Sequence, residues 1–228
     1  MPAFTLYGAR GSTNTDRVRL TLAEGGITDY KLVLLSLQKG EQKSEENMKR
    51  HPWGKIPAIT IPGGFTLYES RAICKYLARK YALPLLPAAD SSDAEAAALF
   101  DQAECTEMLY FAEPAGRIAF EKFAKKFMGL PADEAVVSAA LRSVEACFDV
   151  AERLLQENDY TAGNDFTLVD IYYIPLIQRL FASGYGDVVL SREAVRAWWD
   201  RCTGRPGIQK MLAADREAMA AAGAGAGQ

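Results

Sequence analysis

The chain has 228 residues, of which 49% are hydrophobic and 24% are charged, a balance that provides enough apolar residues for one large domain or two small ones. The formal net charge of -3 and the lack of a strongly basic segment argue against nucleic acid as a partner. No apolar run approaches the roughly 20 residues of a membrane span, and the first residues lack the pattern of a secretory signal, so we expect a cytoplasmic protein without membrane contact.

The first third of the chain alternates strand-like and helical segments. Residues around Phe4 predict a short strand, residues 14–25 a helix that ends at two glycines, and residues 30–35 a second strand. A helix between two such strands requires that the strands pair in parallel with a right-handed crossover.

A polar segment, residues 38–50, follows without a clear periodicity. Residues 57–61 and 65–67 then predict two strands joined by a tight turn, and residues 69–81 predict a helix. We expect the inner face of this helix to carry Ala72, Ile73, Tyr76 and Leu77. The order βαβ followed by ββα is typical of a thioredoxin-like domain, to which we assign residues 1–82.

The rest of the chain is expected to be helical. Residues 83–92 contain two prolines and no periodicity, which predicts a linker before an all-helical domain at 93–228. Apolar residues recur in steps of four and three from Val137 to Leu155 and predict one buried helical stripe. We expect the Ala- and Gly-rich tail from about residue 220 to be flexible.

The cysteines and the histidine argue against metal and disulfide chemistry. The four cysteines are far apart in the sequence, and His51 is the only histidine. Neither a zinc motif nor a Ser-His-Asp triad with several candidate histidines is supported. We therefore expect reduced, mostly structural cysteines, and neither a metal nor another cofactor.

Four motifs carry a resemblance to a known family. Residues 53–58 (WGKIPA) and 67–73 (LYESRAI) look like the glutathione-binding core of cytosolic glutathione transferases, and residues 158–163 (NDYTAG) and 166–171 (FTLVDI) resemble the motif of their second domain. Their order and spacing make the resemblance specific, and it covers most of the chain. Within the family, the segment around Ser12 is most similar to the serine-type phi class, including its fungal relatives.

The resemblance implies the glutathione transferase fold, in which an α/β thioredoxin-like N-terminal domain precedes an all-α C-terminal domain. It implies an enzyme that activates the glutathione thiol as a thiolate and conjugates it to hydrophobic electrophiles, and that also reduces organic hydroperoxides, as serine-type members often do. Glutathione is then the co-substrate and the protein a homodimer. The alternative is a ligand-binding protein with little turnover, because Asp16 and Gln42 stand where the phi class commonly has a basic residue and a histidine.

The γ-glutamyl end of glutathione carries a carboxylate and an ammonium group. Ser70 opens a helix, where the free N–H groups and the helix dipole suit the carboxylate, and Glu69 suits the ammonium group. Ser70 could instead be only an N-cap. In this family the bond between Ile56 and Pro57 is cis and turns the Ile56 backbone toward the cysteinyl backbone, whereas the alternative is an ordinary proline on an edge strand.

The glycyl end carries a second carboxylate. Lys43 and Lys55 are candidates to neutralise it, although most lysines are only solvated. Gln42 is a candidate by position, and it offers a donor without a charge.

Ser12 lies between the first predicted strand and the first predicted helix. A hydroxyl there can donate to the glutathione sulfur and stabilise the thiolate, which makes Ser12 the catalytic candidate. Thr13 and Asn14 are rival donors, and Ser12 could instead only cap the helix. Asp16 in the first helical turn would oppose a thiolate, and we expect Arg17 to offset it.

Two further sets of residues are assigned from the resemblance. The second-substrate pocket is expected against the first half of the helical domain, with the candidates Tyr110, Phe111, Arg117 and Phe120. Trp53 is either a core residue or an aromatic key that inserts into the helical domain of the partner subunit. Thr167 and Asp170 predict a structural capping box at the start of a buried helix.

Overall fold

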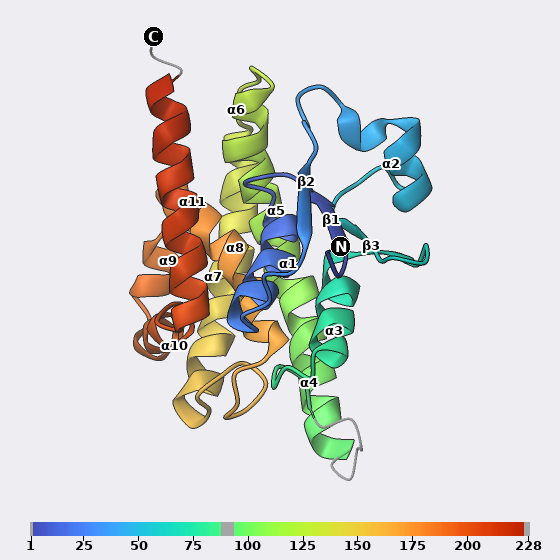
Figure 1. Cartoon of the computed structure of the whole chain (residues 1–228). Helices are drawn as coiled ribbons and strands as arrows, with labels where there is room; N and C mark the ends of the chain where they lie inside the picture. Colours follow the sequence, from blue (N-terminus) through green and yellow to red (C-terminus); the bar gives the residue numbers. More distant parts are fainter. Residues whose placement is uncertain (1, 88–93, 226–228) are drawn as a thin grey trace.

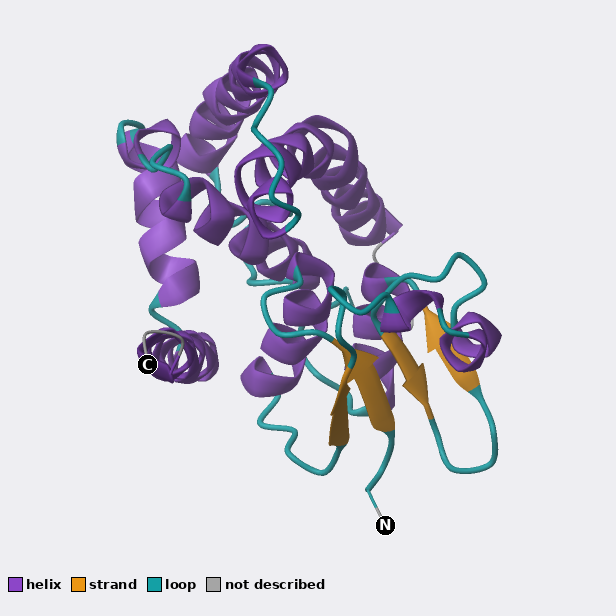
Figure 2. Cartoon of the chain, turned by 90° about the horizontal axis from the view of Figure 1, so that it is seen from above, coloured by secondary structure: helices purple, strands orange, loops and turns teal. Residues whose placement is uncertain are grey.

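The structure is a computed structural model that describes residues 2–87 and 94–225. A four-stranded sheet in the order β2-β1-β3-β4 lies on one side of the molecule, and most of the helices lie on the other (Figures 1 and 2). No helix among the described residues is both long enough and apolar enough to cross a membrane.

The predicted βαβ unit is confirmed. It consists of β1 (Thr5–Gly8), α1 (Thr13–Glu24) and β2 (Lys31–Leu34). The two strands pair in parallel with Leu6 opposite Leu32, as a helical crossover requires. The helix ends at Gly25, and the positive φ of Gly26 takes the chain out of the helical path.

The polar segment that follows is partly helical, which the sequence did not predict. It holds the 3-10 helix η1 (Glu41–Lys43) and the helix α2 (Glu45–Arg50). Ser44 caps α2 by accepting a hydrogen bond from the Asn47 N–H at 3.3 Å. Asn47 is the only buried residue of α2, so no apolar stripe marks this helix in the sequence.

The predicted hairpin is formed by β3 (Ala58–Thr60) and β4 (Thr66–Tyr68), which pair antiparallel and lead into α3 (Ser70–Lys80). The inner face of α3 is offset from the predicted one. Its buried apolar residues are Ile73, Cys74, Leu77 and Ala78, whereas Ala72 is exposed and Tyr76 is only half-buried. Residues 73, 74, 77 and 78 recur with the helical period, and residues 72 and 76 flank that stripe.

The helical part begins with a nearly continuous series of helical segments. These are α4 (Ala94–Thr106), the π-helical turn η2 (Glu107–Ala112), α5 (Glu113–Ala119), the π-helical turn η3 (Phe120–Ala124) and α6 (Lys125–Phe127). It continues with α7 (Glu134–Glu157), α8 (Leu168–Ala182), α9 (Asp187–Leu190), α10 (Glu193–Thr203) and α11 (Pro206–Gly225).

Two predictions for this part can be compared with the helices. The stripe along α7 is confirmed, since Val137, Val144, Phe148 and Leu155 are buried. The last helix, α11, continues past residue 220 to Gly225 because alanine, which dominates the tail, is the strongest helix former. Residues 88–93 and 226–228 lie outside the described residues, and the division into domains at 82 and 93 stays a prediction.

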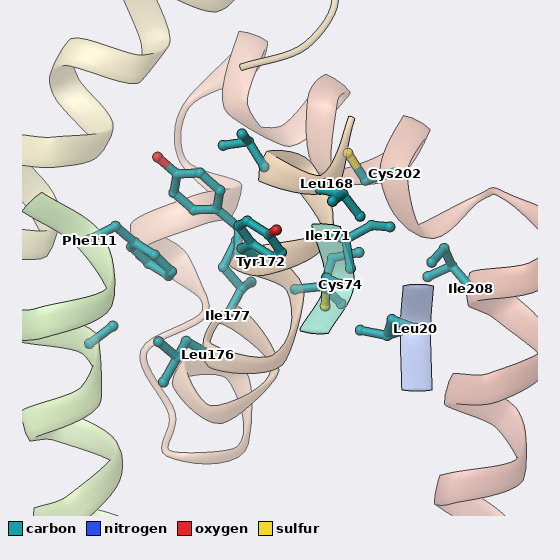
Figure 3. Close-up of a cluster of buried hydrophobic side chains, with 14 of the residues drawn as sticks. Leu20, Cys74, Phe111, Leu168, Ile171, Tyr172, Leu176, Ile177, Cys202 and Ile208 are labelled. Atoms are coloured by element: carbon teal, nitrogen blue, oxygen red, sulfur yellow. The ribbon is translucent and has the colours of Figure 1, made fainter. Parts of the chain in front are cut away.

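The core is centred on α8, which is buried along almost its whole length. Figure 3 shows Ile171, Tyr172 and Leu176 of this helix among apolar side chains from both halves of the chain. The predicted capping box begins α8: Asp170 accepts from the Thr167 N–H at 2.9 Å, and Thr167 caps the first turn.

The cysteines have the expected state. All four are free thiols, and three of them, Cys74, Cys147 and Cys202, are buried. Burial raises the pKa of the Cys74 thiol to about 12, which makes it a poor nucleophile.

Candidate functional site

Ser12 forms the N-cap of α1 at the end of the turn that follows β1. Its hydroxyl oxygen accepts a hydrogen bond from the Thr15 N–H at 3.3 Å, and the side chain is half-buried. A hydroxyl that accepts through its oxygen still has its own proton to donate. The capping role and the predicted role as donor to a sulfur are therefore compatible. Asn14 is exposed and accepts a hydrogen bond from Arg17 through its Oδ1, which leaves its NH2 group free to donate, so it stays a rival to Ser12.

Asp16 forms an ion pair, but with a different arginine from the one we expected. It lies 3.0 Å from Arg19, which also binds Asp215 of α11 through two hydrogen bonds of 2.7 and 2.8 Å. Burial raises the pKa of Asp16 to about 6, against the opposing effect of Arg19. Arg17 points elsewhere and lies 3.5 Å from Glu107, because residues i and i+3 share a helix face and residues i and i+1 do not.

The segments predicted to hold the glycyl carboxylate are joined by one buried side chain. The Asn47 amide donates to the Gln42 carbonyl at 2.8 Å and to the Lys55 carbonyl at 3.1 Å. The Lys43 ammonium donates to the Trp53 carbonyl at 3.0 Å, and both lysines are exposed. Sequence analysis did not single out Asn47, because a polar residue in a polar segment carries no sign of burial.

Glu69 has a backbone conformation that non-glycine residues rarely adopt. Its φ is 71° and its ψ 114°, and its side chain is exposed beside the first turn of α3. Such strain is most often found at functional sites. Ser70, the first residue of α3, is buried, with 5% exposure.

His51 is a buried histidine beside Glu69. The imidazole is 2% exposed, and its Nε2 lies 4.0 Å from a carboxylate oxygen of Glu69. Burial lowers its pKa, and the charge of Glu69 opposes this while that of Lys55 adds to it. Sequence analysis did not indicate the position of His51 beside Glu69, because a single histidine in a polar segment has no pattern.

The bond between Ile56 and Pro57 is cis, as the resemblance implied. The Ile56 side chain is buried just before β3. Among the described residues, no hydrogen-bond partner is found for its backbone N–H or C=O, so both are available for an extended peptide.

The four predicted second-substrate residues do not converge, and this prediction needs correction. Phe111 is fully buried in the core, with ring centroids 5.4 Å from Phe148 and 4.6 Å from Tyr173. The exposed Arg117 pairs with Glu113 of its own helix, and Phe120 is half exposed on η3. A step of one residue along a helix turns the side chain by about a quarter of a turn, so Phe111 points into the core beside the exposed Tyr110, which aromatic content alone could not reveal.

Tyr110, the fourth candidate, lines a cavity of about 700 Å³ in the helical half. The cavity lies between the series α4–η2–α5 and α7, and its apolar lining includes Leu109, Val150 and Leu154. Neither Ser12 nor any residue predicted to bind glutathione contributes to it. It is therefore separate from the surface around Ser12.

Arg179 of α8 reaches the turn before Ser12. Sequence analysis did not single out this residue. Its guanidinium donates to the Gly11 carbonyl and lies 3.9 Å from the ring centroid of Phe123 on η3. An arginine in a mostly apolar helix was the available signal.

Comparison with known proteins gives consistent results along the chain. Models of the glutathione S-transferase N-terminal and C-terminal domains match residues 2–79 and 99–206. Glutathione S-transferase PM239X14 of Arabidopsis thaliana is 38% identical over 202 residues, which cover 87% of this chain and 91% of the relative. Glutathione S-transferase hmp2 of Hypomyces subiculosus is 36% identical over 85% of this chain and 90% of its own. The structure of maize glutathione S-transferase I with an atrazine glutathione conjugate superposes with a TM-score of 0.85 at 33% identity, and covers 94% of this chain and 98% of its own.

Proposed function

Because this chain belongs to the glutathione S-transferase family and is a glutathione transferase, we propose that Ser12 activates the glutathione thiol for attack on a hydrophobic electrophile. The observation that carries this proposal is the Ser12 hydroxyl, which caps α1 through its oxygen and keeps its proton for a sulfur. In the reaction the thiol proton leaves to solvent, the C–S bond forms, and the leaving group departs with its electron pair. Turnover of chlorodinitrobenzene with glutathione tests the transferase activity and separates it from ligand binding alone.

The free energy needed to stabilise the thiolate is within the range that one hydrogen-bond donor at a helix N-terminus can supply. A free thiol with a pKa of about 8.5 is only a few per cent ionised at pH 7, and lowering that pKa by two units takes about 2.7 kcal/mol. A hydrogen bond to a charged group contributes roughly 1.5–3 kcal/mol, and the N-terminus of α1 adds to it. Asp16 opposes the thiolate less than its sequence position suggested, because Arg19 neutralises it.

We propose that the two ends of glutathione are held on either side of His51. Glu69 binds the ammonium group, and Ser70 binds the γ-glutamyl carboxylate at the start of α3. Lys43, Lys55 and Gln42 lie at the opposite end, where two ammonium groups suit the glycyl carboxylate. The Ile56 backbone, between the two ends, pairs with the cysteinyl backbone.

We expect Glu69→Ala and Ser70→Ala to raise the KM for glutathione by about tenfold or more, since each removes a direct partner of a charged group. Glu69→Ala should leave stability nearly unchanged because its side chain is exposed, whereas the buried Ser70 should cost somewhat more. The measurements are KM, calorimetric glutathione binding and thermal unfolding, with Glu45→Ala on the exposed first turn of α2 as the control. Wild-type glutathione binding by both site variants would contradict the proposed site.

We further propose a homodimer in which Trp53 inserts between the helices of the partner. The Trp53 side chain is 68% exposed, which excludes the core alternative, and the apolar cavity of about 700 Å³ is large enough to receive an indole. In a two-fold symmetric dimer, the Trp53 of each subunit would occupy the cavity of the other.

Trp53→Ala should therefore weaken the dimer by about 2 kcal/mol or more, as truncation of buried interface aromatics commonly does. Light scattering over a dilution series measures the effect. Phe127→Ala, which removes a similarly exposed aromatic ring on α6, is the control and should leave the dimer unchanged. A stable wild-type monomer at micromolar concentration would refute the dimer.

We propose that the same site also reduces organic hydroperoxides. The thiolate attacks the peroxide oxygen, the alcohol leaves, and a second glutathione resolves the sulfenic acid to glutathione disulfide and water. A coupled assay with an organic hydroperoxide tests it. The cytoplasmic location and the lack of a metal, cofactor or nucleic acid partner stay predictions.

A further inference from the structure

Arg179 stands out because it is a nearly buried charge without an ion pair. Its residue exposure is 9%, and among the described residues no carboxylate forms an ion pair with it. Burial lowers the pKa of Arg179, and Asp16 of α1 and Asp215 of α11 oppose that shift. Arg19 hydrogen-bonds to both of these carboxylates. A guanidinium stays charged in a protein, so burying it without a counter-charge costs free energy. Such a residue is expected only where its contacts offset that cost.

The contact that Arg179 makes lies in the backbone of the turn before Ser12. Gly11, whose carbonyl accepts from Arg179, has a φ of +73°, which few residues other than glycine adopt. A Cβ at this position would lie 3.0 Å from the guanidinium. Arg179 and Gly11 therefore fit each other closely, and the peptide unit that they fix leads directly into Ser12.

The guanidinium also packs on the Phe123 ring of η3, at 3.9 Å from its centroid. Arg179 on α8, packed on Phe123 of η3, thus contacts the turn from the helical half of the molecule. The turn itself belongs to the β1–α1 connection of the sheet half.

We infer that Arg179 is a positioning residue for thiol activation, which holds the Gly11 carbonyl and thereby sets the Ser12 hydroxyl toward the glutathione sulfur. The inference rests on the proposed function of Ser12. Arg179 acts through Gly11 and touches no reacting atom, so its loss should change the ionisation of the bound thiol more than the affinity for glutathione.

The test is a pH titration of the bound thiol by ultraviolet absorbance, together with the pH profile of kcat/KM. Arg179→Met should move the ionisation to higher pH and lower kcat/KM by about tenfold or more at neutral pH, with a KM for glutathione within about threefold of wild type. Arg179→Lys, which keeps a cationic donor, should recover part of the loss.

Arg205→Met is a matched control. Arg205 also stacks on a phenylalanine, 4.1 Å from the Phe166 ring, and also bonds to α1, but through Glu24 at the far end of that helix. It should leave the thiol titration unchanged. A wild-type titration in Arg179→Met, or an equal shift in Arg205→Met, would overturn the inference.

Two further variants keep the test decisive. If Arg179→Met does not fold, Arg179→Lys and Phe123→Leu should still give smaller shifts to higher pH, and wild-type titrations in both would overturn the inference.

Ser12→Ala separates the two proposals. No shift in Ser12→Ala defeats the assignment of Ser12 itself, whereas a shift in Ser12→Ala without one in Arg179→Met defeats the positioning role alone.

Discussion

Ser12→Ala is expected to lose about 10- to 150-fold of the transferase rate while still binding glutathione. The lost donor contributes roughly 1.5–3 kcal/mol to a charged acceptor, which corresponds to that range if the thiolate limits turnover. In the proposed site the two ends of glutathione are held by other residues, among them Glu69 and Lys55, so the KM for glutathione should change much less. Steady-state kinetics and calorimetry measure the two effects separately.

The pH dependence gives this prediction a definite sign. Without the donor the bound thiol regains a pKa nearer 8.5, so the thiolate that supports turnover forms only at higher pH. The rising limb of kcat/KM should therefore move upward in Ser12→Ala. Thr13→Ala and Asn14→Ala are the controls, and an unshifted profile in Ser12→Ala beside a loss in either of them would transfer the role of donor to that residue.

Ser12→Cys should divert the same position toward a different chemistry. A thiol beside the bound glutathione forms a mixed disulfide by exchange with glutathione disulfide, with release of one reduced glutathione. Mass spectrometry after incubation with glutathione disulfide detects the adduct. A variant that remains unmodified would indicate that position 12 does not face the sulfur.

The parts of the fold that the sequence predicted well are those with a repeated local signal. The stripe of α7 repeats over many turns, and the pair Thr167 and Asp170 fixes the start of α8 by a short-range hydrogen-bond pattern. The segment around α2 has neither signal, since Asn47 is its only buried residue, and so the helix was missed.

The candidate site could be inferred from the sequence where its residues are close together in the chain, and not where it depends on packing between distant segments. Glu69 and Ser70 follow from a motif at the start of one helix. Arg179 lies 168 positions from Gly11, and only the fold brings them together. Phe111 illustrates the converse, because an aromatic residue in the expected region proved to be core.

The two halves of the chain also meet at a buried charge cluster. Glu107 of η2 is fully buried, accepts from the Arg71 Nε at 2.9 Å, and lies 3.5 Å from the Arg17 guanidinium. Burial lowers the pKa of Arg17 to about 10, and Glu107 opposes that shift. Arg17 also donates to the Tyr172 carbonyl of α8 at 3.2 Å, so the cluster joins α1, α3, η2 and α8.

Glu107→Ala should therefore lower the free energy of unfolding by about 3–5 kcal/mol, because it leaves Arg17 buried without a counter-charge. This is a large part of the roughly 5–15 kcal/mol that stabilises a typical domain. Denaturant unfolding measures the loss. Glu104→Ala, one helical turn earlier, is the matched control: its partner Lys75 has a side chain 23% exposed, and loss of that more hydrated pair should cost about 1 kcal/mol. Equal losses in the two variants would show that burial of the Glu107 cluster adds nothing to its contribution.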